Sequence, residues 1–132
     1  MADKTLKLDV ITPEHVALQD ESDSVVVPAV DGDLGIWPNH APLLAGLKPG
    51  VVTYKTASGM AKLVVSGGFI EVANNVITII APAAEKSSEI DFARAEAAKK
   101  RALERLAHKE GIDIARAQAA LARANARLSV RS

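Results

Sequence analysis

Six arginines near the end of the chain could bind anions, because a helix would gather them into two narrow stripes. The same spacing, i, i+7 and i+11, occurs twice, in Arg94, Arg101 and Arg105 and in Arg116, Arg123 and Arg127. At about 100° per residue, each trio covers a stripe only about 40° wide. Guanidinium groups bind phosphate and carboxylate oxygens through paired hydrogen bonds. We interpret the stripes as a site for a phosphate-bearing ligand or an acidic protein surface, with ordinary solubilising charge as the alternative.

The arginines lie in two near-copies of one alanine-rich segment. Residues 90–107 and 112–129 are identical at 11 of 18 aligned positions, and both begin Ile-Asp-x-Ala-Arg-Ala. Alanine, leucine, lysine, arginine and glutamate all favour the helix, so each copy predicts one helix. The short gap between the copies predicts an antiparallel hairpin.

Cap residues predict where these helices begin and end. We expect Ser88 to cap the first helix, which should run from Ile90 to about Lys109. Gly111 suits a left-handed backbone after that helix, and Asp113 should open the second one.

Each predicted helix carries a stripe of mostly small apolar residues one step round from its arginines. Small residues allow two helix axes to approach to about 8 Å, but each contact contributes only a few tenths of a kcal/mol at about 25 cal/mol per Å². With "AAEKSS" at 83–88 as a polar hinge, the hairpin is predicted to be an arm that opens without melting. The stripe residues are Ala95, Ala102, Leu106, Ala117, Ala124 and Leu128.

The chain before the repeat predicts β structure. Leu6, Leu8 and Val10 alternate with polar residues, which is typical of a half-buried strand. Turn-forming segments such as "DGDLG", "KPG" and "GG" separate further β-branched runs, which favours an antiparallel β-sandwich or flattened barrel. We therefore predict an α+β chain with a sandwich over 1–84 and a helical hairpin over 85–132. The further runs are Val25–Val27, Val51–Tyr54, Leu63–Val65, Phe69–Val72 and Val76–Ile80.

Charge is unevenly divided although the whole chain is neutral. Residues 1–88 hold 6 basic and 10 acidic side chains, and residues 89–132 hold 10 basic and 6 acidic ones. The basic tail suggests an acidic partner. A nucleic-acid-binding module is the alternative, but the chain has too few aromatic residues for a base-stacking platform.

The sequence contains no arrangement typical of a catalytic centre. Cysteine is absent, which excludes thiolate chemistry and disulfides, and no serine or threonine occupies a nucleophile elbow. His15, His40 and His108 are dispersed without ligand spacing, so we expect no metal site. No segment has the length and apolarity of a membrane span or the apolar core of a signal peptide.

Four segments together resemble the epsilon subunit of bacterial and chloroplast F-type ATP synthases over essentially the whole chain. The segments "VITPE" at 10–14, "SVVVPAVDGDLGIWPNHAPLLAGLKPG" at 24–50 and "VSGGFIEVANNVITI" at 65–79 look like the sandwich domain of that family. The segment "IDFARA" at 90–95 is similar to the motif associated with ATP binding in its bacterial members.

The resemblance implies a non-catalytic rotor subunit of the central stalk. It places the sandwich against the gamma subunit and the membrane c-ring, so the protein would lie peripherally on the cytoplasmic side of the cell membrane. The hairpin would either fold on the sandwich or extend into the alpha/beta catalytic head and block ATP hydrolysis.

The resemblance also implies ATP as a regulatory ligand of the folded hairpin, with no metal required. Arginines would hold the phosphates, while backbone and carboxylate groups near the start of the first helix would read the adenine. The positions that match the family's ligand residues are Glu85, Ile90, Asp91, Arg94, Ala95, Arg101, Arg123 and Arg127.

Overall fold

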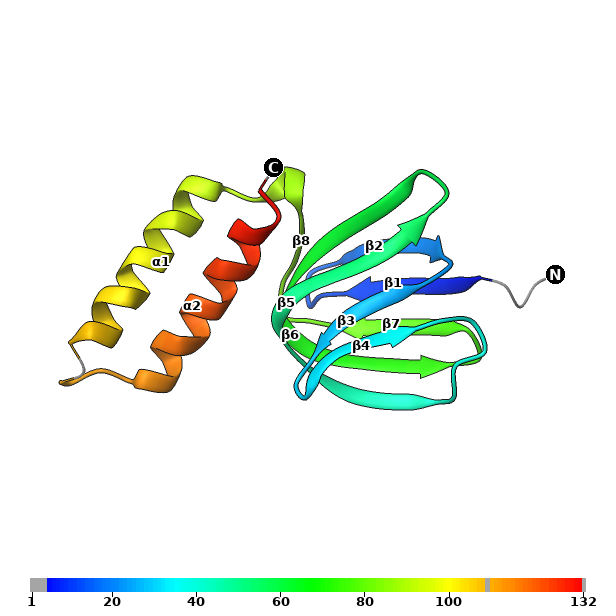
Figure 1. Cartoon of the computed structure of the whole chain (residues 1–132), viewed down its shortest axis with the longest axis horizontal. Helices are drawn as coiled ribbons and strands as arrows, with labels where there is room; N and C mark the ends of the chain where they lie inside the picture. Colours follow the sequence, from blue (N-terminus) through cyan, green and yellow to red (C-terminus); the bar gives the residue numbers. More distant parts are fainter. Residues whose placement is uncertain (1–4, 109, 132) are drawn as a thin grey trace.

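The structure, a computed structural model, describes residues 5–108 and 110–131 and shows a β-sandwich followed by two helices (Figure 1). A short 3-10 turn at Ser87–Glu89 joins the two parts. The predicted α+β order of a sandwich and then a helical hairpin is confirmed. The elements are β1 (Leu6–Ile11), β2 (Val16–Ser22), β3 (Val25–Ala29), β4 (Gly32–Ile36), β5 (Leu43–Thr56), β6 (Gly59–Ala73), β7 (Val76–Ile80), β8 (Ala84–Lys86), α1 (Phe92–Ala107) and α2 (Ile114–Ser129).

The strands form one hydrogen-bonded path in the order β2-β1-β7-β6-β5-β3-β4, with β8 also paired to β6. This path curls over itself into the sandwich, with the long strands β5 and β6 at its middle (Figure 1). Every pairing is antiparallel except that of β1 with β7, which is parallel. The predicted antiparallel sandwich therefore contains one parallel pair, because the long chain between β1 and β7 returns as a crossover and not as a hairpin.

Two segments that were predicted to be turns lie inside strands. The "KPG" segment at 48–50 belongs to β5, and the glycine pair Gly67–Gly68 belongs to β6. Both glycines have positive φ, 107° and 121°, which bends β6 without ending it. The "DGDLG" segment is a turn only at its start, since β4 begins at Gly32. The structure also contains β2, which the β-branched runs did not reveal.

The core of the sandwich is made of alternating strand residues from both layers. In β1 the side chains of Leu6, Leu8 and Val10 are buried while those between them face outward. They meet inward-facing residues of β3, β5, β6 and β7 in one cluster of seventeen buried residues. Among residues 5–108 and 110–131, none after Ala81 is a buried member of that cluster, so the main core lies in the sandwich.

The helices begin at aspartates that occupy the same place in the two sequence copies. The Asp91 carboxylate accepts a hydrogen bond from the backbone N–H of Arg94 at 3.0 Å, and Asp113 does the same for Arg116 at 3.1 Å. Asp113 therefore opens α2 as predicted. The prediction that Ser88 caps the first helix is wrong, because Ser88 lies in the 3-10 turn and Asp91 is the cap.

The first helix also ends earlier than predicted. It stops at Ala107, with His108 as the C-cap, whereas the predicted end at Lys109 lies outside the described residues. Gly111 has the expected left-handed conformation, at φ 70°, but it lies in the connection and not at the helix end.

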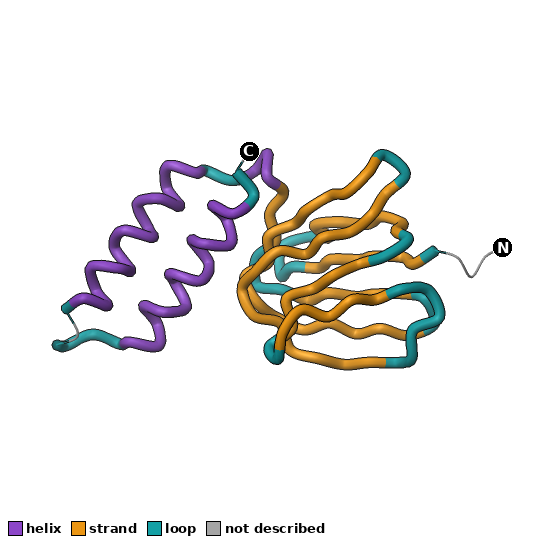
Figure 2. The backbone as a smooth tube through the Cα atoms, in the orientation of Figure 1, coloured by secondary structure: helices purple, strands orange, loops and turns teal. Residues whose placement is uncertain are grey.

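The hairpin lies against one end of the sandwich, with α2 between α1 and the sheet (Figure 2). The α2 helix packs on β5 and β6. The segment expected to be a polar hinge is partly a strand, since β8 pairs with residues 63–65 of β6. Backbone hydrogen bonds of β8 therefore tie the start of the arm to the sandwich.

The alanine stripe forms the contact between the helices. Ala95 and Ala102 of α1 and Ala117 and Ala124 of α2 are buried. The leucines of the stripe, Leu106 and Leu128, are half-buried.

Candidate functional site

A pocket of about 360 Å³ lies where the start of α1, the end of α2 and the segment after β7 come together. The strand β8 contributes Glu85 and the 3-10 turn contributes Glu89. Six of the eight positions expected to bind ligand line this pocket. The lining residues are Glu85, Glu89, Asp91, Arg94, Ala95, Ala98, Arg101 and Arg127.

Three arginines and three carboxylates face one another in this pocket, so its charges balance. One pair is already joined, because the Nε–H of Arg127 donates to the Glu85 carboxylate at 2.7 Å. Both side chains are about 29% exposed. This ion pair bridges the end of α2 and β8, and it leaves the two terminal amino groups of the Arg127 guanidinium for another acceptor.

The remaining acids have one oxygen engaged by the backbone. Asp91 caps α1 through the N–H of Arg94, and the Glu89 carboxylate accepts from the N–H of Lys86 at 2.8 Å. Each carboxylate has a second oxygen and further lone pairs. These acids can therefore accept hydrogen bonds from a ligand amine while the neighbouring arginines donate to its phosphates.

Two of the expected ligand residues are not brought to this pocket. Ile90 is buried against Val64 of β6 and Ala126 of α2, so its side chain holds the hairpin on the sheet. Arg123 lies in α2 and is half-buried, but it is not among the lining residues.

Glu89 and Ala98 line the pocket but were not among the expected residues. Ala98 lies four residues after Arg94 and three before Arg101, which places it on their face of the helix. That spacing could have identified it from the sequence. Nothing in the sequence pointed to Glu89, because its position depends on the 3-10 turn.

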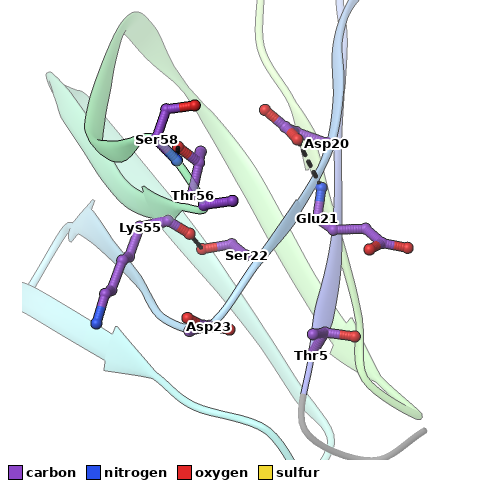
Figure 3. A pocket seen from close by; sticks show the side chains of 9 residues that line it. Thr5, Asp20, Glu21, Ser22, Asp23, Lys55, Thr56 and Ser58 are labelled. Carbon is purple, nitrogen blue, oxygen red and sulfur yellow. Dashed lines mark hydrogen bonds between the residues drawn. The ribbon is translucent and has the colours of Figure 1, made fainter.

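A larger hollow, of about 410 Å³, lies at the other end of the sandwich beside the hairpin between β5 and β6 (Figure 3). Two of its hydroxyl groups are used by the fold: Ser22 donates to the carbonyl oxygens of Ser24 and Lys55, both at 2.7 Å, and Thr56 donates to that of Gly59 at 2.9 Å. The other polar side chains are the hydroxyls of Thr5 and Ser58, the carboxylates of Asp20, Glu21 and Asp23 and the Lys55 amine. This hollow is more acidic than the arginine pocket and has no pair of cations to bind an anion.

His15 and His40 each contact a different part of the chain and do not contact each other. His15 contacts Thr12, with 3.3 Å between Nδ1 and Oγ1, and His40 Nδ1 lies 2.7 Å from the carbonyl oxygen of Ala41. Within residues 5–108 and 110–131, no group of three or more His, Cys, Asp or Glu side chains could hold a metal ion. No helix in the described part of the chain is long and apolar enough to cross a membrane.

Two family descriptions match consecutive parts of the chain. Residues 5–87 match the β-sandwich domain of the ATP synthase delta/epsilon chain, and residues 88–131 match its long α-helix domain. The boundary between the matches falls just after β8.

The chain is similar to bacterial proteins named ATP synthase epsilon chain. It is 46% identical over 109 residues to that of Pelotomaculum thermopropionicum, which covers 83% of this chain and 81% of the relative. It is 49% identical over 107 residues to that of Syntrophomonas wolfei, which covers 80% of this chain and 78% of the relative.

Solved structures share the fold at low identity. A chain of the Euglena gracilis mitochondrial ATP synthase superposes with a TM-score of 0.80 at 22% identity, over 96% of this chain and 80% of that one. A chain of the Tetrahymena thermophila mitochondrial ATP synthase superposes with a TM-score of 0.53 at 16% identity, over 64% and 68%.

Proposed function

This chain belongs to the delta/epsilon chain family of ATP synthases, and from that membership we propose a regulated stalk subunit whose hairpin binds ATP when folded and blocks ATP hydrolysis when extended. The chain is a non-catalytic subunit. Its partners are the gamma subunit and the c-ring, and the alpha/beta catalytic head when the arm extends. In the complex it lies peripherally on the cytoplasmic side of the cell membrane. Family membership favours this function over a nucleic-acid-binding module.

The observation that carries the proposal is the arginine pocket. Its side chains come from three segments, β8 with the following turn, the start of α1 and the end of α2, and they meet only while the hairpin is folded on itself and on the sheet. A ligand that bridges Arg94 and Arg127 therefore binds the folded arm and not the extended one. Such a ligand stabilises the folded arm by mass action, by about 2.7 kcal/mol at a hundred times its Kd.

The folded arm is held by few contacts, which suits a reversible switch. Apart from β8, the hairpin docks through a small cluster in which Val64, Ile90 and Ala126 are buried and Val51, Phe92 and Val130 are half-buried. The sandwich has its own core of seventeen buried residues. Release of the arm therefore exposes a few apolar side chains and leaves the sandwich core intact. Shifting such an equilibrium from 1:99 to 99:1 takes about 5.5 kcal/mol, so ATP alone biases the arm without locking it.

Calorimetry of the full chain with ATP tests the site. Arg94→Ala and Arg127→Ala remove arginines from different helices, and each should weaken ATP binding by about tenfold or more, because each removes a charge-assisted contact to phosphate. The helix content, measured by circular dichroism, should be unchanged.

Lys100→Ala is the matched control, because it removes one positive charge from an exposed position of α1 that does not line the pocket. Wild-type affinity in both arginine variants would place the ATP site elsewhere. Equal losses in Lys100→Ala and the arginine variants would mean that net charge alone governs binding.

An exposed apolar row on the sandwich suits the proposed contact with the stalk. Register pairs place Phe69 of β6 beside Ile80 of β7, Ile80 beside Ile11 of β1, and Ile11 beside Val16 of β2. Phe69 is 62% exposed and Ile80 is 56% exposed. Contiguous exposed apolar side chains mark protein interfaces, whereas isolated ones do not. On the side of Phe69 away from Ile80, its neighbour is Gly46 of β5, which has no side chain. The Val30 side chain lies beside Gly46 and so extends the row.

Phe69→Asp should abolish or strongly weaken capture of the chain by the cognate gamma subunit, because it places a charge at the centre of the apolar row. Met60→Asp is the control, since Met60 is equally exposed on the same strand but lies at its other end. Unchanged capture of the folded Phe69→Asp chain would assign the interface to another face.

A further inference from the structure

The sequence repeat relates the two helices by an approximate twofold rotation. Each residue of the first copy has its counterpart 22 residues later. Because α1 and α2 are antiparallel neighbours, a twofold axis perpendicular to the hairpin exchanges the start of α1 with the start of α2. It also exchanges the end of α2 with the end of α1. Any arrangement at the junction of the α1 start and the α2 end is therefore repeated at the tip of the hairpin.

The structure contains this second arrangement. A pocket of about 220 Å³ at the tip is lined by Arg105, Ile112, Asp113, Arg116 and Ala117. Asp113, Arg116 and Ala117 are the counterparts of Asp91, Arg94 and Ala95, and Arg105 is the counterpart of Arg127 in the opposite helix.

Local geometry is the same at both ends. Arg94 and Arg116 each donate their backbone N–H to the preceding aspartate, at 3.0 and 3.1 Å. The alanine after each of these arginines is buried in the seam between the helices, as Ala95 and as Ala117. In both pockets an arginine near the start of one helix therefore lies beside an arginine near the end of the other.

The tip pocket differs in charge and size. Glu85 and Glu89 precede the repeat, so they have no counterparts at the tip. The first pocket balances three arginines with three carboxylates, whereas two arginines and Asp113 are the charged residues that line the tip pocket. Glu104 and Glu110 line a neighbouring hollow that shares Arg105 and Ile112 with it. Within the described residues, no ion pair involves Arg105 or Arg116. The negatively charged Asp113 carboxylate occupies the start of α2, so an anion at the tip would be bound mainly through the two guanidinium groups.

We propose that the tip of the hairpin is a second anion site, in which Arg105 and Arg116 bind a phosphate group between the two helices. The proposal extends the function proposed above, since it treats the tip as the symmetry-related copy of the ATP pocket. With one lining carboxylate in place of three, and with about 220 Å³ in place of about 360 Å³, this site takes the phosphate group and not the nucleoside. An anion bound there joins α1 to α2 at the end farthest from β8, so it holds the two helices together where the sandwich does not.

Titration of the full-length chain with inorganic pyrophosphate, followed by nuclear magnetic resonance of the arginine Nε–H groups, tests the tip directly. The Arg105 and Arg116 signals should shift together and saturate with one affinity. Arg105→Gln should weaken that affinity by about tenfold, because binding loses one of its two guanidinium groups. Lys100→Gln removes the same charge from the same helix outside the tip pocket. It should leave the affinity for pyrophosphate within about twofold of the wild-type value.

The result separates this inference from the function proposed above. Saturable shifts at Arg105 and Arg116 that persist in Arg127→Gln establish the tip site whether or not ATP binds the first pocket. Absent or non-saturating shifts at the tip, or equal weakening by Lys100→Gln and Arg105→Gln, overturn the second site even where ATP shifts Arg94 and Arg127. A titration with ATP in parallel reports on the first pocket through those two residues.

Discussion

Tyr54 is the one tyrosine of the chain, and its side chain lies in the sandwich core. Burial raises the pKa of its phenol above the ordinary value of about 10, because the charged phenolate is poorly solvated there. The negative charge of Asp20 raises the pKa further. The folded state therefore binds this proton more tightly than the unfolded state does.

The free energy of unfolding should consequently fall at alkaline pH, because of the ionisation of Tyr54. Its contribution is fully present below about pH 10, where both states are protonated, and is lost as the pH rises and the unfolded state ionises first. Absorbance at 295 nm should show the tyrosine ionising above its ordinary range. Between pH 9 and 11, the free energy of unfolding should decrease less for Tyr54→Phe than for the wild type. A titration midpoint at the ordinary value in the folded chain would contradict this account.

At the residue scale, helical periodicity placed the arginines of the candidate site, and the family resemblance supplied its other positions. Arg94 and Arg101 line the pocket from the face that their spacing predicted, and Asp91 and Ala95 line it at positions that the resemblance implied. Ile90 does not, because the first helix begins two residues later than its motif and this apolar side chain turns into the cluster on the sheet. Which face of each helix meets the sheet depends on tertiary packing, so the sequence did not separate Ile90 from its neighbours.

At the scale of elements, the bend in β6 decides how the sandwich is built. Before the bend β6 pairs with β5 and β8, and after it with β5 and β7, so one strand serves both parts of the sheet. The chain at Gly68 passes so close to β7 that an added Cβ would overlap the carbonyl oxygen of Ile80. Glycine is required there both for its positive φ and for this close approach.

Gly68→Ala should therefore destabilise the sandwich by at least about 3 kcal/mol, since it combines a strained backbone with overlap of main-chain atoms. Gly59→Ala is a matched control, because Gly59 has nearly the same φ, 122°, but nothing within 4 Å of the added Cβ. It should cost only the backbone strain, about 1 to 3 kcal/mol. Urea unfolding of both variants measures the difference, and equal losses would show that the contact with Ile80 relaxes freely.

The strands were predicted less well than the helices, and the bend in β6 is one reason. Glycine and proline usually interrupt strands, so "KPG" and "GG" suggested breaks in what are the long strands β5 and β6. The strand β2 has the sequence VALQDES, whose polar residues mostly face solvent, so it lacks a β-branched run. The strand β8 exists because β6 offers it a partner, and its three residues carry no period of their own. Helix signals are local, whereas these strands are fixed by partners distant in the sequence.

At the scale of the whole molecule, the arm depends on the sandwich for its packing, whereas the sandwich does not depend on the arm. In the part of the chain that the structure describes, the buried residues of the sandwich core end at Ala81. The arm, by contrast, completes its docking cluster with Val51 and Val64 from the sheet. A chain that ends at residue 87 keeps all eight strands and should fold, whereas the hairpin alone has its alanine seam, the contacts of Arg131 with Glu96 and Phe92, and the intrinsic helicity of its sequence.

This asymmetry permits a clean test of the arm in the assembled ATP synthase. Deletion from Ser88 onward should leave the complex intact and raise its ATP hydrolysis severalfold, because the segment proposed to enter the catalytic head is gone while the apolar row around Phe69 is retained. The truncated chain should also still be captured by the gamma subunit, and its thermal unfolding should remain cooperative. Phe69→Asp in the full chain is the complementary control, since it should impair assembly while leaving the arm in place. Unchanged hydrolysis by an intact complex that carries the truncated subunit, with and without detergent activation, would refute an inhibitory role for the arm and leave the sandwich as the functional part of the chain.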